Sequence, residues 1–298
     1  IRSIRMDKHL SYWQNNVGVE EFTNWHSTTD HINKLSLLSG YVYNRECSSV
    51  LDCGAGNGSL YKVLKGLNLN LKYKGIDITK KLVTDAQNNG IDIEYGDIEQ
   101  LQFKDESYDL VVATDVISHL YDYRPALREM LRVAKKHVIF TTFKPSVQSL
   151  KYVHPQDKPK IIGWYPGKWD RGNMPITCPK LGFYPHRTRH SGYILTMVKE
   201  KTYASPFGFY KHAKKDEQDN PILIHHYYDI HKLYANIKSI AKENNTEYKI
   251  NYSFSNDQFR LRYLQYYSEM SDKEKNEVPH ISAYADMFYI DKVKNTDD

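Results

Sequence analysis

The sequence predicts an α/β domain built on a doubly wound, mostly parallel sheet, and three observations lead to this fold class. Between residues 49 and 143, short apolar runs typical of strands alternate with runs of helical periodicity. A glycine-rich turn directly follows the first of these strands. An aspartate also stands at or just after the end of each of the first three strands, where a parallel sheet gathers its ligand-binding residues: Asp52, Asp77 and Asp97.

The elements follow in order along the chain. We expect strands near residues 49–53, 72–78, 92–95, 108–113 and 137–143, with helices between them near 58–67, 80–89 and 124–134. In the third helix, apolar residues recur at i, i+3, i+4 and i+7. This spacing makes one apolar face that can pack against the sheet.

The chain changes character after the fifth strand. Residues 144–221 hold nine of the eleven prolines, together with many tyrosines and basic residues, so we expect an irregular insertion there. The sheet pattern then resumes, with a helix near 229–244, a strand near 248–254, a polar helical stretch near 257–275 and a closing strand near 283–290.

Composition excludes several classes of protein. The 298 residues include 41 basic and 36 acidic side chains, and the net charge of +5 is milder than that of a dedicated nucleic-acid binder. Three scattered cysteines suit neither a disulfide framework nor a zinc site, and we expect no metal. No apolar run approaches the roughly 18 residues that span a bilayer, and no signal-peptide profile is visible. We therefore expect a cytoplasmic protein with no membrane association.

The glycine-rich turn has the physical properties of a ligand-binding loop. Residues without Cβ reach unusual φ/ψ values and let backbone N–H groups approach a ligand. The turn reads GAGNG over residues 54–58, and Ser59 stands where the dinucleotide fingerprint G-x-G-x-x-G requires glycine. With Asp52 ahead of it, the pattern is acidic-x-G-x-G-x-G. This pattern resembles motif I of the class I S-adenosylmethionine-dependent methyltransferases.

The context of the loop extends the resemblance. The run "YDLVVATDVISHLYDYRPALREMLRVAKKHVIFTTF", residues 108–143, is similar to the same family. The similarity is strong over residues 50–143 and weak over residues 229–290. It implies a Rossmann-like methyltransferase fold with seven strands, of which the last is antiparallel, a large insertion after strand five, and bound S-adenosylmethionine.

By this resemblance, the cofactor contacts come from the ends of successive strands. Asp52 and the loop would hold the methionine part, Asp77 the ribose, and Asp97 with Ile98 the adenine. The candidate cofactor contacts are Asp52, Gly54, Ala55, Gly56, Asn57, Gly58, Asp77, Ile78, Asp97, Ile98, Thr114 and Trp13. A single aspartate is more often a turn or helix-capping residue, so the prediction depends on the joint order of these residues.

Two residues after the fourth strand are candidates for catalysis, Asp115 and His119. A base beside the oxygen of an alcohol acceptor accelerates transfer by about 10²–10⁴-fold. The alternatives are a packing or capping role for His119 and a backbone turn at Asp115. Residues 114–117 read TDVI, unlike the Asp/Asn-Pro-Pro-aromatic run of enzymes of this fold that methylate base amines, so such amines are not expected acceptors.

Two further segments are expected to bind the acceptor. An N-terminal helical segment, residues 1–48, resembles the cap that covers the methionine end of the cofactor in many small-molecule and sugar methyltransferases. An insertion or lid, residues 144–226, supplies aromatic faces and guanidinium groups, which suit a ring that carries an anionic group. The alternatives are a helix that only packs on the sheet and a loop packed by its own aromatic residues. The candidate acceptor contacts are Tyr12, His26, Trp164, Trp169, Arg171, Arg187 and Arg189.

The sequence thus predicts an O-methyltransferase with a cofactor-binding half at residues 49–143 and a C-terminal half of the same domain at 227–298. The favoured acceptor is a hydroxyl of a saccharide or nucleotide sugar, which makes carbohydrate modification the expected role. An RNA methyltransferase acting on a cap or ribose, with nucleic acid as a possible but not favoured partner, is one alternative. A catalytically inactive cofactor-binding partner protein is the other.

Overall fold

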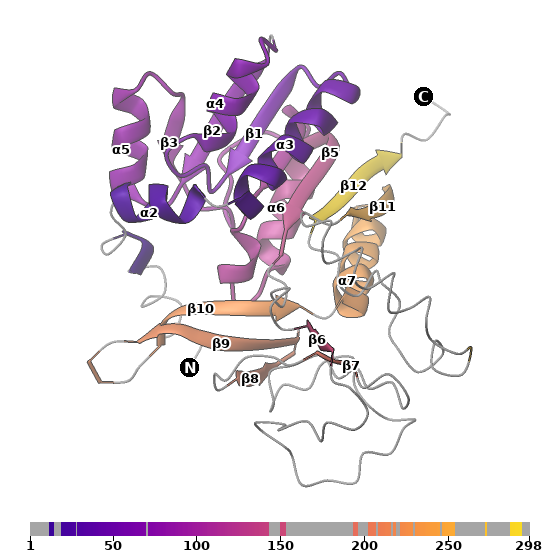
Figure 1. Ribbon diagram of the computed structural model, residues 1–298. Coiled ribbons are helices and arrows are strands. Elements are labelled where there is room, and N and C mark those ends of the chain that lie inside the picture. The colour runs from indigo at the N-terminus through magenta and orange to yellow at the C-terminus, as the bar shows by residue number, and fades with distance from the viewer. Residues whose placement is uncertain are drawn as a thin grey trace, which may run out of the picture.

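The fold is seen in a computed structural model of the chain (Figure 1). The structure describes residues 12–14, 19–27, 29–69, 71–142, 150–152, 193–195, 202–206, 208–215, 217–218, 221–228, 230–244, 246–253, 272 and 287–293.

The main sheet has seven strands in the order β11-β12-β5-β4-β1-β2-β3. Its strands are β1 (Ser49–Cys53), β2 (Lys72–Asp77), β3 (Ile93–Tyr95), β4 (Tyr108–Ala113), β5 (Ala134–Thr141), β11 (Glu247–Ser253) and β12 (Met287–Val293). Neighbouring strands from β3 to β5 pair in parallel, whereas β12 pairs antiparallel with both β5 and β11. The predicted doubly wound sheet with an antiparallel last strand is confirmed.

Helices cover both faces of this sheet. The helices are α2 (Val19–His26), α3 (Thr29–Asn44), α4 (Ser59–Gly66), α5 (Lys80–Asn88), α6 (Arg124–Val133) and α7 (Ile230–Glu243), with a short 3-10 turn η1 (Ile117–His119) after β4. Apolar residues of α3, α4 and α5 form one core with the sheet, and those of α6 and α7 form another on the opposite face. Helices α2 and α3 lie in the N-terminal region, and the cap at residues 1–48 stays a prediction.

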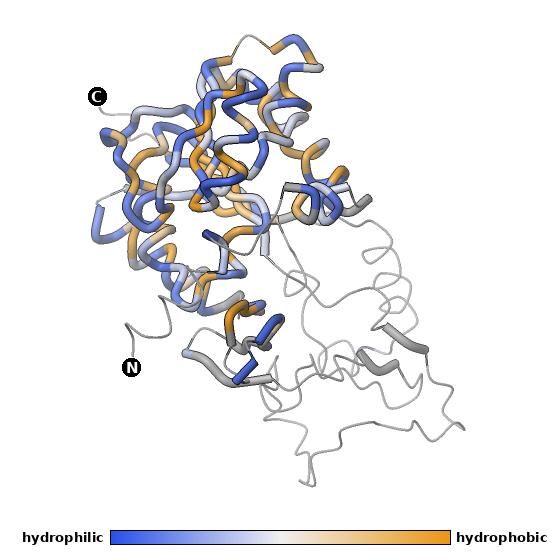
Figure 2. The backbone as a smooth tube through the Cα atoms, turned by 90° about the vertical axis from the view of Figure 1, so that its left-hand side faces the viewer, coloured by the Kyte–Doolittle hydropathy of each residue, from blue (hydrophilic) through white to orange (hydrophobic). Residues whose placement is uncertain are grey.

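Strand β4 shows why helices can pack on both faces of the sheet. All six of its residues are buried. Leu110 and Val112 belong to the core with α3 to α5, whereas Val111 and Ala113 belong to the core with α6 and α7. Since side chains alternate between the two faces of a strand, a continuous apolar run is what a central parallel strand requires. Figure 2 shows apolar stretches, in orange, alternating with hydrophilic ones, in blue, along the backbone of the domain.

Several element boundaries differ from the predicted ones. Strand β5 begins at Ala134, directly after α6, rather than at residue 137, because its pairing with β4 starts at Ala134. Strand β12 continues to Val293 because each of its residues has a partner in β11. The predicted helical stretch 257–275 lies outside the described residues, apart from Asp272. None of the helices in the described ranges is both long and apolar enough to cross a bilayer.

The prediction of an irregular insertion is wrong for its last part. A three-stranded antiparallel sheet forms there, from β8 (Thr202–Ser205), β9 (Gly208–Lys215) and β10 (Pro221–Tyr228), and β6 (Leu150–Tyr152) pairs with β7 (Tyr193–Leu195). Strands β9 and β10 cross beneath the carboxyl ends of the parallel strands (Figure 1). The alternation in β10 is hidden in the sequence because two of its buried residues, His226 and Tyr228, are polar.

Candidate active site

The glycine loop between β1 and α4 has a backbone that only glycine adopts readily. Gly54, Gly56 and Gly58 have φ values of 75°, 57° and 82°. A Cβ at Gly54 would stand 2.1 Å from Cγ2 of Val116, and one at Gly56 would stand 2.1 Å from Cζ of Phe22. The glycines therefore serve two purposes, since they allow left-handed conformations and admit neighbouring side chains against the loop.

Asp77, at the end of β2, holds this loop. Its Oδ2 accepts a hydrogen bond from the backbone N–H of Gly56 at 2.8 Å, and its Oδ1 accepts one from the N–H of Thr79 at 2.7 Å. Burial raises the pKa of this carboxyl, and the two backbone donors oppose that rise. A carboxylate has about four lone-pair positions, so its two oxygens can accept further hydrogen bonds from ribose hydroxyls.

Asp52 lies in β1, just ahead of the loop, and is buried. Its Oδ2 accepts a hydrogen bond from the hydroxyl of Tyr73 at 2.7 Å, and burial raises its pKa to about 7. The loop itself is fastened to β2, because the N–H groups of Gly54 and Ala55 both donate to the carbonyl of Ile76, at 2.8 and 2.9 Å.

The end of β3 supplies the other predicted acidic residue. Asp97 is half-buried, and its Oδ1 accepts a hydrogen bond from the N–H of Glu99 at 2.9 Å, while Ile98 beside it is buried. The cap reaches the same edge, since Nε2 of Gln14 donates to the hydroxyl of Tyr95 at 2.7 Å. The structure thus brings the ends of β1, β2 and β3 together at one edge, as the fold class predicts.

The residues present at this edge fit S-adenosylmethionine. The cradle is lined by glycines, carboxylates stand at the ends of β2 and β3, and Ile78 is half-buried beside Asp77. Among the described residues, the hydroxyl of Thr114 is buried without a hydrogen-bond partner, as expected of a group that awaits a ligand. The side chain of Asn57 instead turns to α2, where its Nδ2 donates to the hydroxyl of Thr23 at 3.2 Å.

The N-terminal cap packs over the loop and over His119. The ring of Phe22 contacts Gly56 and stacks on the ring of His26, with centroids 3.8 Å apart. The ring of Trp13 lies 4.8 Å from that of His119. Only the tertiary structure reveals the contact between Phe22 and the loop, because nothing in the local sequence marks this residue.

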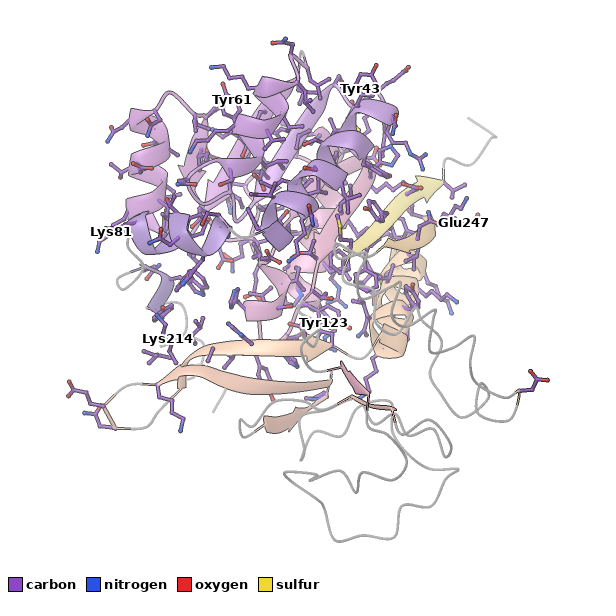
Figure 3. The ribbon with its side chains drawn as sticks, viewed as in Figure 1. Tyr43, Tyr61, Lys81, Tyr123, Lys214 and Glu247 are labelled. Atoms are coloured by element: carbon purple, nitrogen blue, oxygen red, sulfur yellow. The ribbon has the colours of Figure 1, made fainter. Side chains whose placement is uncertain are left out.

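The three-stranded sheet of β8, β9 and β10, called here the second sheet, also contacts the cap. Figure 3 shows Lys214 on β9. Its ammonium lies 5.2 Å from the ring centroid of Tyr12 and 5.1 Å from that of Trp25. The hydroxyl of Tyr12 is buried and, within the described part of the chain, has no hydrogen-bond partner. Strand β9 therefore closes the same side of the site as the cap.

Asp115, one of the two candidate catalytic residues, is part of an ion pair. Its Oδ1 lies 2.5 Å from the ammonium of Lys34 and 3.0 Å from the hydroxyl of Thr141, and its Oδ2 lies 3.4 Å from Nδ1 of His31. Burial alone would raise the pKa of Asp115, but His31 and Lys34 together hold it well below its usual range. A carboxylate so stabilised is a poor proton acceptor, and the arrangement favours an anchor for α3 over a base.

His119, the other candidate, lies in the turn η1 with an oriented ring. Its Nδ1 is 3.2 Å from the carbonyl oxygen of Ile224, on β10, and the ring of His225 is 5.3 Å away. Because a carbonyl only accepts hydrogen bonds, Nδ1 must carry the proton in the neutral ring. Nε2 is then the nitrogen with the lone pair, which suits a base.

His226, next along β10, predicts a pH dependence of stability. Burial lowers its pKa to about 4, so the folded state favours the neutral ring and the stabilisation is present above the unfolded pKa, about 6.5, and lost below it. Between pH about 7 and about 4, the wild type should lose about 3 kcal/mol more unfolding free energy than the His226→Asn variant. Urea denaturation across this range measures the difference, and parallel curves would contradict the assignment.

The structure does not describe every predicted contact. Trp164, Trp169, Arg171, Arg187 and Arg189 lie outside the described residues. Conversely, sequence reasoning missed three residues that shape the site, namely Lys34, Phe22 and Tyr228. None of them has a local sequence signal, because each acts on a residue far away in the chain.

Comparison with known proteins agrees with this geometry. Residues 51–142 match the family model described as methyltransferase domain. The uncharacterized methyltransferase YcgJ of Bacillus subtilis is 34% identical over 105 residues, which are 32% of this chain and 41% of that protein. The demethylmenaquinone methyltransferase of Thermotoga maritima is 33% identical over 89 residues, which are 29% of this chain and 39% of that protein.

The matched region is only part of each protein. The chain spans about two fifths of the length of these curated relatives. Among solved structures, magnesium protoporphyrin IX methyltransferase from Synechocystis with bound S-adenosylmethionine has a TM-score of 0.46 at 12% identity, over 97% of this chain and 95% of that one. By the family match, residues 51–142, which hold the glycine loop and its acidic companions, form a methyltransferase domain, and its residues fit S-adenosylmethionine as the cofactor.

Proposed function

We propose that this protein transfers the methyl group of S-adenosylmethionine to a hydroxyl of a small polar acceptor. The observation that carries the proposal is the orientation of His119, whose Nδ1 faces the carbonyl of Ile224. This orientation leaves Nε2 as the proton acceptor of the ring. A positioned base is needed for an alcohol more than for an amine, because an amine already has a nucleophilic lone pair.

The residues of the chain have separate tasks in this reaction. The cofactor, when bound, supplies an electrophilic methyl group. The glycine loop and Asp77 fix the position of the cofactor, and His119 accepts the acceptor's hydroxyl proton at Nε2 as the oxygen attacks. Trp13 packs on the His119 ring and excludes water from it. Asp115 keeps α3, and thereby the cap, at the edge of the sheet through Lys34.

We further propose that the acceptor is a saccharide or nucleotide sugar. A cluster of aromatic rings lies beside His119. The ring centroid of Trp13 is 5.7 Å from that of Tyr12 and 6.5 Å from that of Trp25. Aromatic faces suit the apolar face of a sugar ring, and the buried hydroxyl of Tyr12 offers it a hydrogen-bonding group. The aromatic and basic residues predicted between 164 and 189 would complete this contact.

Replacement of His119 by Gln tests the base. We expect kcat to fall by about 10²–10⁴-fold, because Gln fills similar space but cannot accept the proton. The affinity for S-adenosylhomocysteine should not change. The measurement is the transfer of labelled methyl from S-adenosylmethionine to UDP-glucose and related nucleotide sugars, with calorimetric titration of S-adenosylhomocysteine as the control.

The same assay separates the alternatives. Undiminished transfer by the His119→Gln variant would remove the base from the mechanism. Transfer to capped RNA but to no nucleotide sugar would replace the proposed acceptor, and its rate should then fall steeply with salt because phosphate contacts release counterions. Tight cofactor binding without transfer to any acceptor tested would favour an inactive partner protein.

A further inference from the structure

Strand β10 touches the turn that carries His119 at three places. The carbonyl of Ile224 accepts from Nδ1–H of His119 at 3.2 Å. Nδ1 of His226 lies 3.2 Å from the carbonyl oxygen of Leu120. The hydroxyl of Tyr228 lies 2.6 Å from that same oxygen and 2.9 Å from the carbonyl oxygen of Ile117. The two side-chain contacts come from alternate residues of the strand, His226 and Tyr228, and so share one face of it.

The two side-chain contacts hold the backbone on both sides of the base. Ile117 and Leu120 flank His119 in the chain, so their carbonyls define the orientation of the turn. Tyr228 and His226 are both buried, and a buried hydroxyl or imidazole is costly unless it is hydrogen-bonded. Apolar side chains of similar size would fill the space, but they would give the turn no fixed position. The buried hydroxyl of Tyr228 and imidazole of His226 are therefore best explained by the backbone carbonyls that they hold in position.

Strand β10 is itself held in place by contacts with Tyr123 and, through it, with α7. The ring of Tyr228 packs edge-on against that of Tyr123, with centroids 4.6 Å apart, and Nδ2 of Asn236, on α7, donates to the hydroxyl of Tyr123 at 2.7 Å. Figure 3 shows Tyr123 just above β10, toward α7. The contact between β10 and η1 is thus connected to the main sheet through α7, which limits the freedom of the turn.

We propose that Tyr228 and His226 are positioning residues, which hold the turn Ile117–Leu120 so that Nδ1–H of His119 meets the carbonyl of Ile224 and Nε2 is left to accept a proton. The inference rests on the proposed function only for the role of His119 as the base. It assigns the second sheet a part in assembling the reactive group, in addition to closing the site.

The tautomer of His119 tests the proposal without any acceptor. Long-range ¹H–¹⁵N spectra of the ¹⁵N-histidine-labelled full chain report which ring nitrogen carries the proton. The His119→Gln variant assigns the signals of His119, and His225→Gln assigns those of the ring beside it. In the wild type we expect Nδ1 protonated and Nε2 unprotonated.

Three variants separate positioning from packing. Tyr228→Phe keeps the ring and removes the hydroxyl, and His226→Leu removes the donor to Leu120. His226→Asn keeps a donor, since its Nδ2 can take the place of Nδ1. We expect Tyr228→Phe and His226→Leu to shift the tautomer ratio of His119 by about tenfold, the effect of losing one buried hydrogen bond, and His226→Asn to leave it near the wild-type ratio.

The outcomes are distinguishable. Wild-type tautomer ratios in folded Tyr228→Phe and His226→Leu, judged by unchanged circular dichroism and binding of S-adenosylhomocysteine, would overturn the positioning role. An equal shift in His226→Leu and His226→Asn would also overturn it, because the donor would then be irrelevant. A wild-type His119 protonated on Nε2 would overturn both the proposed base and the orientation of its ring proposed here.

Discussion

Replacement of Asp77 by Asn is expected to weaken the binding of S-adenosylhomocysteine by roughly 100-fold. The two oxygens of Asp77 accept from the N–H groups of Gly56 and Thr79, so both are acceptors of backbone donors. Asn offers one oxygen and one NH₂ group, and the NH₂ would face a backbone donor. The loop would lose one of its hydrogen bonds to β2. The ligand would lose the carboxylate that accepts hydrogen bonds from its ribose hydroxyls.

Calorimetric titration measures this effect, and Asp92→Asn is its matched control. Asp92 is an aspartate at the amino end of β3, away from the glycine loop, and it is paired with Lys74 on the surface. We expect its replacement to change the dissociation constant by no more than about twofold, since surface pairs are weak. Wild-type affinity in the Asp77→Asn variant would show that the ribose carboxylate has been misplaced.

Replacement of Gly56 by Ala should affect both the loop and the cap. The φ of 57° is unfavourable for alanine by about 1–2 kcal/mol, and the new Cβ would overlap the ring of Phe22. Phe22 is buried and stacked on His26, so the overlap can be relieved only if α2 moves. We expect a loss of stability larger than the backbone cost alone, together with at least about tenfold weaker binding of S-adenosylhomocysteine.

Gly90→Ala isolates the backbone cost. Gly90 has a φ of 71°, but a Cβ there would meet no atom within 4 Å. The difference in unfolding free energy between the two variants, measured by urea denaturation, is therefore the cost of the overlap with Phe22. In the Phe22→Ala background, Gly56→Ala should cost little more than Gly90→Ala. Equal effects of the two glycine substitutions in the wild-type background would argue against close packing of α2 on the loop.

The sequence by itself determined the class of the main sheet, with its antiparallel last strand, and the glycine loop that follows β1. Strand β4 is predictable because a buried central strand must be apolar on both faces, and residues 110–113, LVVA, form such a run. The glycine loop is predictable for a local reason, since only glycines tolerate three positive φ values in five residues. Both signals lie within short stretches of chain, where periodicity and residue type carry the information.

Only the tertiary structure decided what surrounds the candidate base. Asp115 could be a base or an anchor until Lys34, 81 residues away, is seen beside it. His226 and Tyr228 look like surface residues in the sequence, because polar side chains are usually exposed. They are buried through hydrogen bonds to carbonyls more than 100 residues away. No local pattern encodes these hydrogen bonds, because they form only where the sheet of β8, β9 and β10 packs against the main domain.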